Sequence, residues 1–249
     1  MSRSTGYTRT HLACLNNVAY GTGRLLGNYR WAWKAVSHAL QLAETSGSRH
    51  LAPLCKDSQV VLLIEQGRSR EAMVLTEEVL KLLRHEKGTM GPNQESITRR
   101  GVIWIQLGEF RKAVSDLELA RERQVAMGER LILVDTLTYL AIAYVRIGDP
   151  RALGTSEEAI RLLTEIGYAN MQPQRIFWHH FQILESLGQT PRLPYLRQAV
   201  EAIEAQALTL SRAQQRRFRA EVSVNRTILE DWERHQRVFN SGPAISMAP

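Results

Sequence analysis

Cysteine is scarce in this sequence, with only Cys14 and Cys55 among 249 residues. Two cysteines cannot make the disulfide framework on which small secreted domains depend, and a chain of this length buries a sizeable core without one. A metal site would need further ligands at suitable spacing, and the sequence offers none near this pair. A disulfide or a metal pair is therefore the less favoured interpretation, and a shared packing position is the favoured one.

Long apolar runs are also missing. The most apolar stretch, 131–147, is interrupted by Asp135 and Arg146, so it predicts a buried helix and not a membrane span. The first twelve residues are polar and lack the apolar segment of a secretory signal. These absences favour a cytoplasmic location with no membrane partner.

Motifs for phosphate binding, metal binding and hydrolysis are absent too. The segment Gly21-Thr22-Gly23 lacks the lysine of a phosphate loop. His179-His180 are adjacent, so on a helix they point about 100° apart and are poorly placed to share a metal. Acidic pairs such as Glu77-Glu78 and Glu157-Glu158 fit the solvated face of a helix better than a converging catalytic pair. We therefore expect a protein that is not an enzyme, with no catalytic residue, metal site or cofactor.

The net charge of +7 is spread over both ends of the chain and forms no long basic run. The densest cluster is a group of four arginines near the C-terminus, Arg212, Arg216, Arg217 and Arg219. A solvated helix face accounts for such a cluster, and contact with phosphate or an acidic partner is the alternative. Nucleic acid is therefore the least favoured partner class.

What the sequence does contain is a regular series of glycines. Five of them follow one another at intervals of 40 or 41 residues: Gly27, Gly67, Gly108, Gly148 and Gly188. Four more lie midway between these: Gly47, Gly88, Gly128 and Gly167. A fixed period of this length is typical of solenoid repeats, and glycine is favoured where the chain turns left-handed past the end of a helix. The series therefore predicts an all-α chain in which each helix ends near a glycine.

The third unit of this series shows the pattern within a repeat most clearly. Gly101 lies seven residues before Gly108, Phe110 lies two after it, and Ala113 and Ala120 lie five and twelve after it. Apolar and small residues recur three or four apart, as in an amphipathic helix. The small residues predict a close approach of the two helices of the unit.

The repeat has one further shared position, and its fourth and fifth units have features of their own. Twelve or thirteen residues before each glycine of the first set lies a residue that we expect to pack in the core: Cys14, Cys55, Ser96, Thr136 and Ile176. In the fourth unit we expect Gly154 to prolong the turn before a helix over 156–166, and in the fifth a helix over 195–208.

This arrangement resembles the tetratricopeptide repeat, although the period of 40 exceeds the 34 residues usual in that family. It is similar to the longer repeats of bacterial regulatory nucleotide triphosphatases and of cyclase- or LuxR-type regulators. The resemblance implies a right-handed α-solenoid of about five antiparallel helix pairs with closing helices at the C-terminus. The expected divisions are a tail at 1–8, repeats at 9–48, 49–89, 90–128, 129–168 and 169–209, closing helices at 210–236, and a disordered tail at 237–249.

The resemblance also implies where a partner would bind, because the first helices of such pairs line the concave side. One polar row lies ten residues before the glycines and comprises Asn17, Asp57, Thr98, Thr138 and, as an exception, Trp178. A second row, two or three before the glycines, includes Arg24, Glu65, Gln106 and Arg146. Arg175 is expected to join Arg146 and Trp178 in a site for an acidic or aromatic group, and Gln182 completes the expected groove. The alternative interpretation is that these residues form only the wet side of the helices.

The sequence as a whole predicts a noncatalytic scaffold that binds a protein or a peptide, with a role in bacterial signalling implied by the resemblance. The first alternative is self-assembly into a homo-oligomer through the terminal helices. The second is a helical repeat that binds nucleic acid through the arginine cluster at 212–219.

Overall fold

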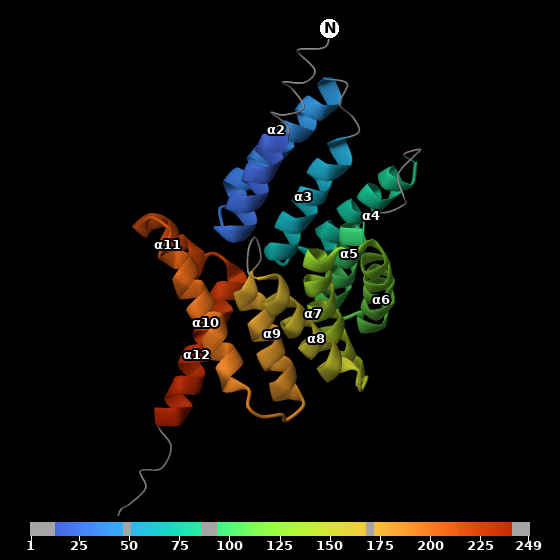
Figure 1. The fold of residues 1–249 in the computed structure, drawn as a ribbon. Helices are drawn as coiled ribbons and strands as arrows, with labels where there is room; N and C mark the ends of the chain where they lie inside the picture. Colours follow the sequence, from blue (N-terminus) through green and yellow to red (C-terminus); the bar gives the residue numbers. More distant parts are fainter. Residues whose placement is uncertain (1–12, 47–50, 86–93, 168–171, 241–249) are drawn as a thin grey trace, which may run out of the picture.

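The computed structural model of the chain describes residues 13–46, 51–85, 94–167 and 172–240. Within these ranges every regular element is a helix, as expected, and no strand occurs (Figure 1). Residues 13–20 are helical and continue into the π-helical turn η1, Gly21–Leu25. The α-helices that follow are α2 (Tyr29–Thr45), α3 (Ala52–Glu65), α4 (Ser69–His85), α5 (Gln94–Gln106), α6 (Phe110–Met127), α7 (Arg130–Ile147), α8 (Ala152–Ile166), α9 (Pro173–Ser186), α10 (Leu193–Ala207), α11 (Arg212–Ala220) and α12 (Ser223–Asn240).

The helices pack in the order in which they occur along the chain. From α2 to α12, each helix contacts the next one, and α3, α5, α7 and α9 also contact one another in succession. Helices α4, α6 and α8 cover these from outside (Figure 1). The inner row of helices therefore faces a common interior.

The expected glycine turns are confirmed at seven positions. Positive φ angles of 65–81° occur at Gly27, Gly67, Gly108, Gly128, Gly148, Gly167 and Gly188. Gly47 and Gly88 lie outside the described residues. At Gly108 the N–H donates to the Ile105 carbonyl at 3.0 Å, and the Glu109 N–H donates to the Trp104 carbonyl at 2.9 Å. These bonds satisfy the last carbonyls of α5, and a side chain at this φ of 81° would be strained.

The close approach of α5 and α6 is confirmed as well. A Cβ atom added to Gly101 would lie 2.5 Å from Leu117 Cγ, well inside van der Waals contact. Ala113 and Ala120, on the facing side of α6, are fully buried. The small residues of the repeat thus allow the two helices to approach closely.

The expectation for Gly154 was wrong. Helix α8 begins at Ala152, so Gly154 lies inside the helix and not in a prolonged turn. The turn is completed earlier because Asp149 Oδ1 accepts a hydrogen bond from the Arg151 N–H at 2.9 Å. Helix α10 likewise begins two residues before the expected Tyr195, at Leu193.

The shared packing position is confirmed for four of its five members: Cys55, Ser96, Thr136 and Ile176 are each at most 1% exposed. Cys14 departs from the pattern, because it is exposed. Both cysteines are free, and burial raises the pKa of the Cys55 thiol to about 11. Cys55 therefore behaves as a small core residue.

Helix α7 contains the most apolar segment of the sequence. Its residues Val134, Leu137, Leu140 and Ala141 are fully buried, so the expected buried helix is confirmed. None of the helices in the described ranges combines the length and the apolar character needed to cross a membrane.

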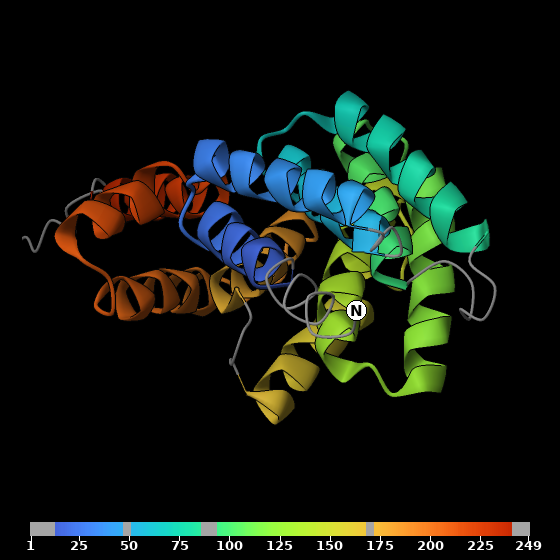
Figure 2. The same ribbon diagram turned by 90° about the horizontal axis from the view of Figure 1, so that it is seen from above.

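The array curls so that its first helices meet its last ones, as the view from above shows (Figure 2). A Cβ atom on Gly27 would lie 2.9 Å from Glu221 Cβ at the end of α11. The Ser223 hydroxyl of α12 donates to the Glu65 carbonyl at 3.3 Å, and Leu26 packs against the large core cluster formed by α7 to α12. The first and last helices of the described chain are therefore in contact, and the inner row of helices lines the interior between them.

Two histidines of α9 make the stability of this fold dependent on pH. Burial lowers the pKa of His180 to about 4, and burial together with Arg175 lowers the pKa of His179 to about 3. Both are neutral in the folded chain near pH 6, whereas the unfolded chain takes up protons near the usual histidine pKa of about 6.5. The stabilisation that comes from keeping these two imidazoles neutral is therefore fully present above pH 6.5 and is lost as the pH falls towards 4. We expect each histidine to lower the free energy of unfolding at pH 5.5 by about 1 kcal/mol relative to its value above pH 6.5.

Urea unfolding at pH 7.5 and pH 5.5 measures this loss. His180→Gln is expected to reduce the difference between the two pH values. Ser156→Ala removes the hydroxyl that lies 2.7 Å from His180 Nδ1 but keeps the imidazole, so it should lower stability at both pH values and preserve the difference. An unchanged pH dependence in His180→Gln would contradict the assignment.

Candidate binding pocket

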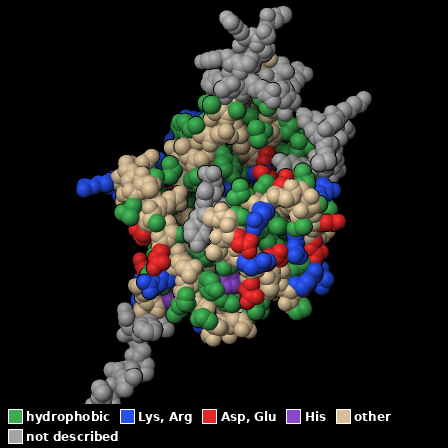
Figure 3. All heavy atoms as spheres, viewed as in Figure 1, with side chains coloured by type: hydrophobic (Ala, Val, Ile, Leu, Met, Phe, Trp, Pro, Cys, Tyr) green, Lys and Arg blue, Asp and Glu red, His purple; other side chains and the backbone are tan. Residues whose placement is uncertain are grey.

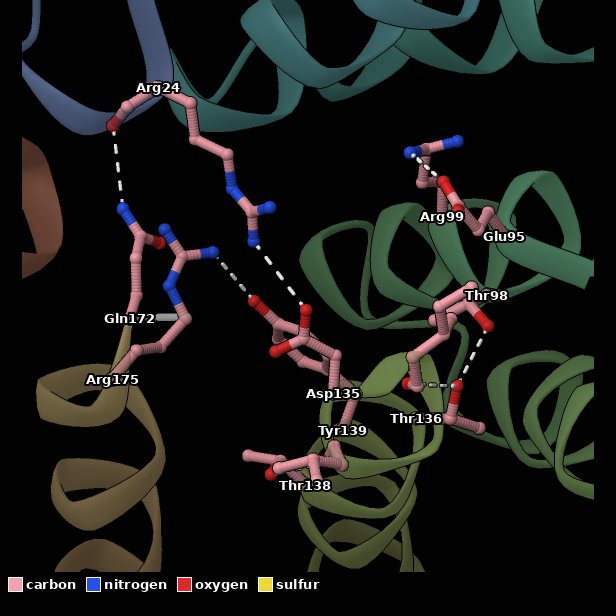
Figure 4. A network of polar contacts seen from close by, with 12 residues as sticks. Arg24, Glu95, Thr98, Arg99, Asp135, Thr136, Thr138, Tyr139, Gln172 and Arg175 are labelled. Atoms are coloured by element: carbon pink, nitrogen blue, oxygen red, sulfur yellow. Dashed lines mark hydrogen bonds and ion pairs between the residues drawn. The ribbon is translucent and has the colours of Figure 1, made fainter. Parts of the chain in front are cut away.

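A pocket of about 220 Å³ lies in the interior that the inner helices surround. Its walls come from η1, α3, α5, α7 and α9 and from the residues just before them, so almost every inner helix contributes. Three basic and three acidic side chains line it: Arg24, Arg99 and Arg175, and Glu65, Glu95 and Asp135. Figure 4 shows most of this network from close by, with its members on four separate segments of the chain.

The most deeply buried charges of the pocket are those of Arg175 and Glu65. Arg175 Nη2 lies 2.7 and 2.8 Å from the two carboxylate oxygens of Glu65, and Arg175 Nη1 donates to the Tyr139 hydroxyl at 2.9 Å. The two charged side chains are 8% and 5% exposed. Burial by itself would lower the pKa of Arg175, but Glu65 and Tyr139 outweigh it and hold that pKa well above its usual value. Arg175 thus keeps its charge, and its contacts with Glu65 join α9 to α3.

Arg24 extends this network to the N-terminal helix. Its Nη2 lies 3.6 Å from Asp135 Oδ2 (Figure 4). Its Nε lies 3.4 Å from Glu65 Oε1, and its Nη1 donates to the Tyr20 hydroxyl. The Arg24 carbonyl also accepts a hydrogen bond from Gln172 Nε2 at 3.4 Å. Glu65 therefore compensates part of the positive charge of both Arg24 and Arg175. The contacts of Arg24 with Asp135 and Gln172 join η1 to α7 and to the start of α9.

Arg99 forms a second ionic group on the opposite wall. It pairs with Asp57 of α3 and, at 2.6 Å, with Glu95 of its own helix. The Ser96 hydroxyl donates to Asp57 Oδ1 at 3.1 Å. Burial raises the pKa of Asp57, although Arg99 acts in the opposite direction. These contacts bind α3 to α5 along the pocket wall.

Three buried polar atoms of the pocket-lining residues have no hydrogen-bond partner within the described chain, and one of them, Arg24 Nε, still lies 3.4 Å from Glu65 Oε1 as an ion pair. The other two are Arg175 Nε, a donor, and Gln172 Oε1, an acceptor. The residues that carry them are 6% and 5% exposed and line the pocket. A buried polar group without a partner costs free energy, so the site is suited to a ligand that offers both an acceptor and a donor.

Of the residues expected in the groove, four line this pocket: Arg24, Glu65, Thr98 and Arg175. The hydrogen-bonding capacity of Thr98 is already used, because its hydroxyl bonds Gln94, Thr136 and Gln124 of the chain itself. The Thr138 hydroxyl likewise donates to the Val134 carbonyl of its own helix at 2.8 Å. Asp57 is engaged with Arg99. In this row Asp57 and Thr98 therefore join neighbouring helices and Thr138 bonds within its own helix, so these three hydrogen-bonding groups are engaged within the chain.

The structure does not bring Arg146, Arg175 and Trp178 into one site. Arg146 is exposed and lies over the Phe110 ring, 4.7 Å from its centroid. The Trp178 indole donates to Asp231 Oδ2 of α12 at 2.8 Å. Only Arg175 reaches the pocket. Helix periodicity placed the three on similar faces, but each face meets a different neighbour.

The other expected residues lie outside the pocket as well. Gln106 lies at the end of α5, where its amide donates to the Ile64 carbonyl at 3.1 Å and accepts from Ser69 at 2.7 Å. Gln182 contacts His179 at 3.1 Å, and Asn17 is exposed. None of these three lines the pocket.

A row of three charged residues lines the pocket, and sequence reasoning found Arg175 of this row but missed Glu95 and Asp135. All three lie thirteen residues before a glycine of the first set. Arg99 and Tyr139 lie one turn further along the same helix faces, nine residues before their glycines. The available signal was that Glu95 and Asp135 lie three residues before Thr98 and Thr138 of the expected row and four before Arg99 and Tyr139. Residues three or four apart share a helix face.

Other candidates for chemistry do not form a site. Ser156 and His180 are hydrogen-bonded, but both are 3% exposed, and the His180 ring packs edge-on against Tyr195. In the ranges that the structure covers, no group of three or more His, Cys, Asp or Glu side chains could hold a metal ion. The inner pocket therefore remains the candidate binding site.

Comparison with known proteins gives no family for this chain. No protein-family model matches the sequence, and no curated protein matches it either. The tetratricopeptide resemblance therefore stands on the residues of the chain alone.

Proposed function

We propose that this chain is a noncatalytic binding module of the tetratricopeptide type, whose inner pocket holds a short polar stretch of a partner polypeptide. The unsatisfied donor and acceptor on Arg175 and Gln172, inside a pocket lined by both signs of charge, carry the proposal. A role in bacterial signalling belongs to the same proposal and rests on the resemblance of the repeats.

Features of the helices support the repeat type. Left-handed glycines end the helices at the expected places, and small residues lie where α5 and α6 approach closely. The inner helices contact one another in succession, as in a solenoid. We propose a right-handed array of five helix pairs followed by two closing helices, α11 and α12.

The size and charge of the pocket define the ligand. A volume of about 220 Å³ admits one or two side chains and excludes a folded domain. The three arginines and three carboxylates favour a segment that carries both a hydrogen-bond donor and an acceptor. Because the charged groups are mostly buried, salt should weaken this binding only moderately.

Leu131 offers a way to block the pocket without breaking its ion pairs. It lines the pocket but is 53% exposed, so it lies at the mouth. Peptides selected from a random display library on the wild-type chain are expected to lose at least tenfold in affinity, about 1.4 kcal/mol, for Leu131→Trp. Isothermal titration calorimetry with the selected peptides measures the loss.

The matched control is Leu208→Trp, because Leu208 is 82% exposed and does not line the pocket. This variant should bind the peptides as the wild type does. Failure to enrich any sequence, or equal affinity of Leu131→Trp and the wild type, would remove the pocket as the binding site.

A further inference from the structure

A second hollow lies where the first helix pair meets the C-terminal helices. Its volume is about 630 Å³, and it is formed by the beginning of α2, the turn between α3 and α4, and the end of α11. These three segments are far apart in the sequence and are brought together by the curl of the array (Figure 2). We name this hollow the junction cleft.

Positive charge dominates the junction cleft. Four basic side chains line it, Arg30, Lys34, Arg68 and Arg217, against a single carboxylate, Glu221. Arg68 pairs with Glu71 at 2.6 Å, whereas Arg30, Lys34 and Arg217 form no ion pair within the described chain.

Over α6 to α8, by contrast, several charges of opposite sign are paired. Figure 3 shows basic and acidic side chains intermixed over α6 to α8. Arg121 pairs with Glu158 there, and Arg151 with Glu118. The junction cleft is thus a local excess of unpaired positive charge.

The backbone adds to this potential. Helix α2 begins at Tyr29 in the wall of the cleft, and the side chain of Asn28 makes no capping hydrogen bond. The first turn of α2 contains no acidic residue. The positive end of the helix dipole and its first N–H groups are therefore free to act on an anion beside Arg30 and Lys34.

Aromatic side chains give the cleft a fixed shape. Tyr29 and Trp33 line it, and both are packed against the hydrophobic core of the N-terminal helices. Trp33 also packs against the neighbouring core cluster between α3 and α5. The wall beside the basic residues is accordingly rigid and partly apolar.

We propose that the junction cleft binds the phosphate groups of a phosphorylated small molecule. Arginine and lysine from three segments converge on one bounded hollow, and a polyphosphate has enough acceptor oxygens to bind all of them at once. A ligand held in this way joins α2 to α11 and so fastens the closure of the array.

The arrangement favours a compact ligand over a nucleic-acid strand. Of the arginine cluster at 212–219, only Arg217 lines the cleft. Arg219 instead forms an ion pair with Glu204 of α10 at 2.6 Å. The basic groups therefore do not form a continuous track of the kind that follows a nucleic-acid backbone.

Calorimetric titration of the full chain at low salt with inorganic triphosphate, ATP and adenosine tests the proposal. We expect triphosphate and ATP to bind and adenosine alone not to bind. Tighter binding of ATP than of triphosphate would identify a nucleotide as the source of the phosphate, through contact with Trp33, and equal binding would identify the phosphate chain itself. Absence of triphosphate binding at millimolar concentration would overturn the proposal.

The double variant Arg30→Gln/Lys34→Gln is expected to weaken triphosphate binding at least tenfold. Its matched control is Lys81→Gln/Arg111→Gln, which removes the same charge from exposed positions that do not line the cleft. Equal weakening by both variants would show a mere effect of net charge and would overturn the assignment. Binding of a single-stranded RNA oligonucleotide without binding of triphosphate would also overturn it, in favour of a nucleic-acid surface.

Closure of the array supplies a second readout. Triphosphate should raise the melting temperature of the wild type and of the control variant, and it should have little effect on Arg217→Gln, which loses the only cleft arginine of α11. A full shift in Arg217→Gln would contradict a ligand that bridges the two ends. Leu131→Trp should keep the shift, because Leu131 belongs to the inner pocket.

Discussion

Glu65→Ala is expected to lower the free energy of unfolding by about 3–5 kcal/mol, because it leaves the buried guanidinium of Arg175 without its counter-charge. Arg175 Nη2 contacts both oxygens of Glu65, and both side chains are almost completely buried. The Glu65 carboxylate also lies 3.4 Å from Arg24 Nε, so in the variant the charge of Arg24 loses part of its counter-charge too. Urea unfolding followed by circular dichroism measures the loss.

Two comparisons separate this effect from a general loss of charge. The exposed pair Arg197–Glu201 on α10 should contribute less than about 1 kcal/mol, so Glu201→Ala serves as the surface control. The double variant Glu65→Leu/Arg175→Met replaces both charges by apolar groups and should recover most of the stability. A loss for Glu65→Ala no larger than that for Glu201→Ala would show that the buried pair is not formed.

The consequence of this pair goes beyond stability. It joins α3 to α9 across 110 residues of chain, directly at the inner pocket. Contacts between elements so distant in sequence close a long loop, and the contact must offset the conformational entropy that the chain loses when this loop closes. Loss of Glu65 should therefore also loosen the pocket in which we propose that the partner polypeptide binds.

Gly101→Val is expected to lower the free energy of unfolding by about 3 kcal/mol, because two helices meet at this residue. The first added carbon would lie 2.5 Å from Leu117 Cγ and 2.8 Å from Leu117 Cδ2. Leu117 is itself fully buried on α6, so it has little space into which to move. The two helices would have to separate, and their shared core would lose contact.

Gly154→Val is the matched control, since Gly154 also lies inside a helix but has no atom within 4 Å of an added Cβ. Valine has a higher helix propensity than glycine, so this variant should be neutral or stabilised by a few tenths of a kcal/mol. Thermal unfolding of the two variants side by side gives the comparison. Similar melting temperatures would contradict the close approach of α5 and α6.

The sequence by itself determined the local features of this protein. Glycines at a fixed interval defined where helices end, because a residue at φ near 70° carries a steric penalty that only glycine avoids. The small residues Gly101 and Ala113 predicted a close helix contact, since neighbouring helices of one unit are joined by a short turn. Even at this level one local detail was missed, because the side chain of Asp149 starts α8 before Gly154.

Only the tertiary structure decided which polar residues form a site. The curvature of the array is the sum of small rotations between successive helices, and no single segment of sequence specifies that sum. Closure of the curve placed Glu65 against Arg175 and brought Arg217 to the beginning of α2. Polar rows that periodicity predicts as one wet face were thereby divided between buried helix contacts, the inner pocket and the outer surface, because burial depends on which distant helix covers each face.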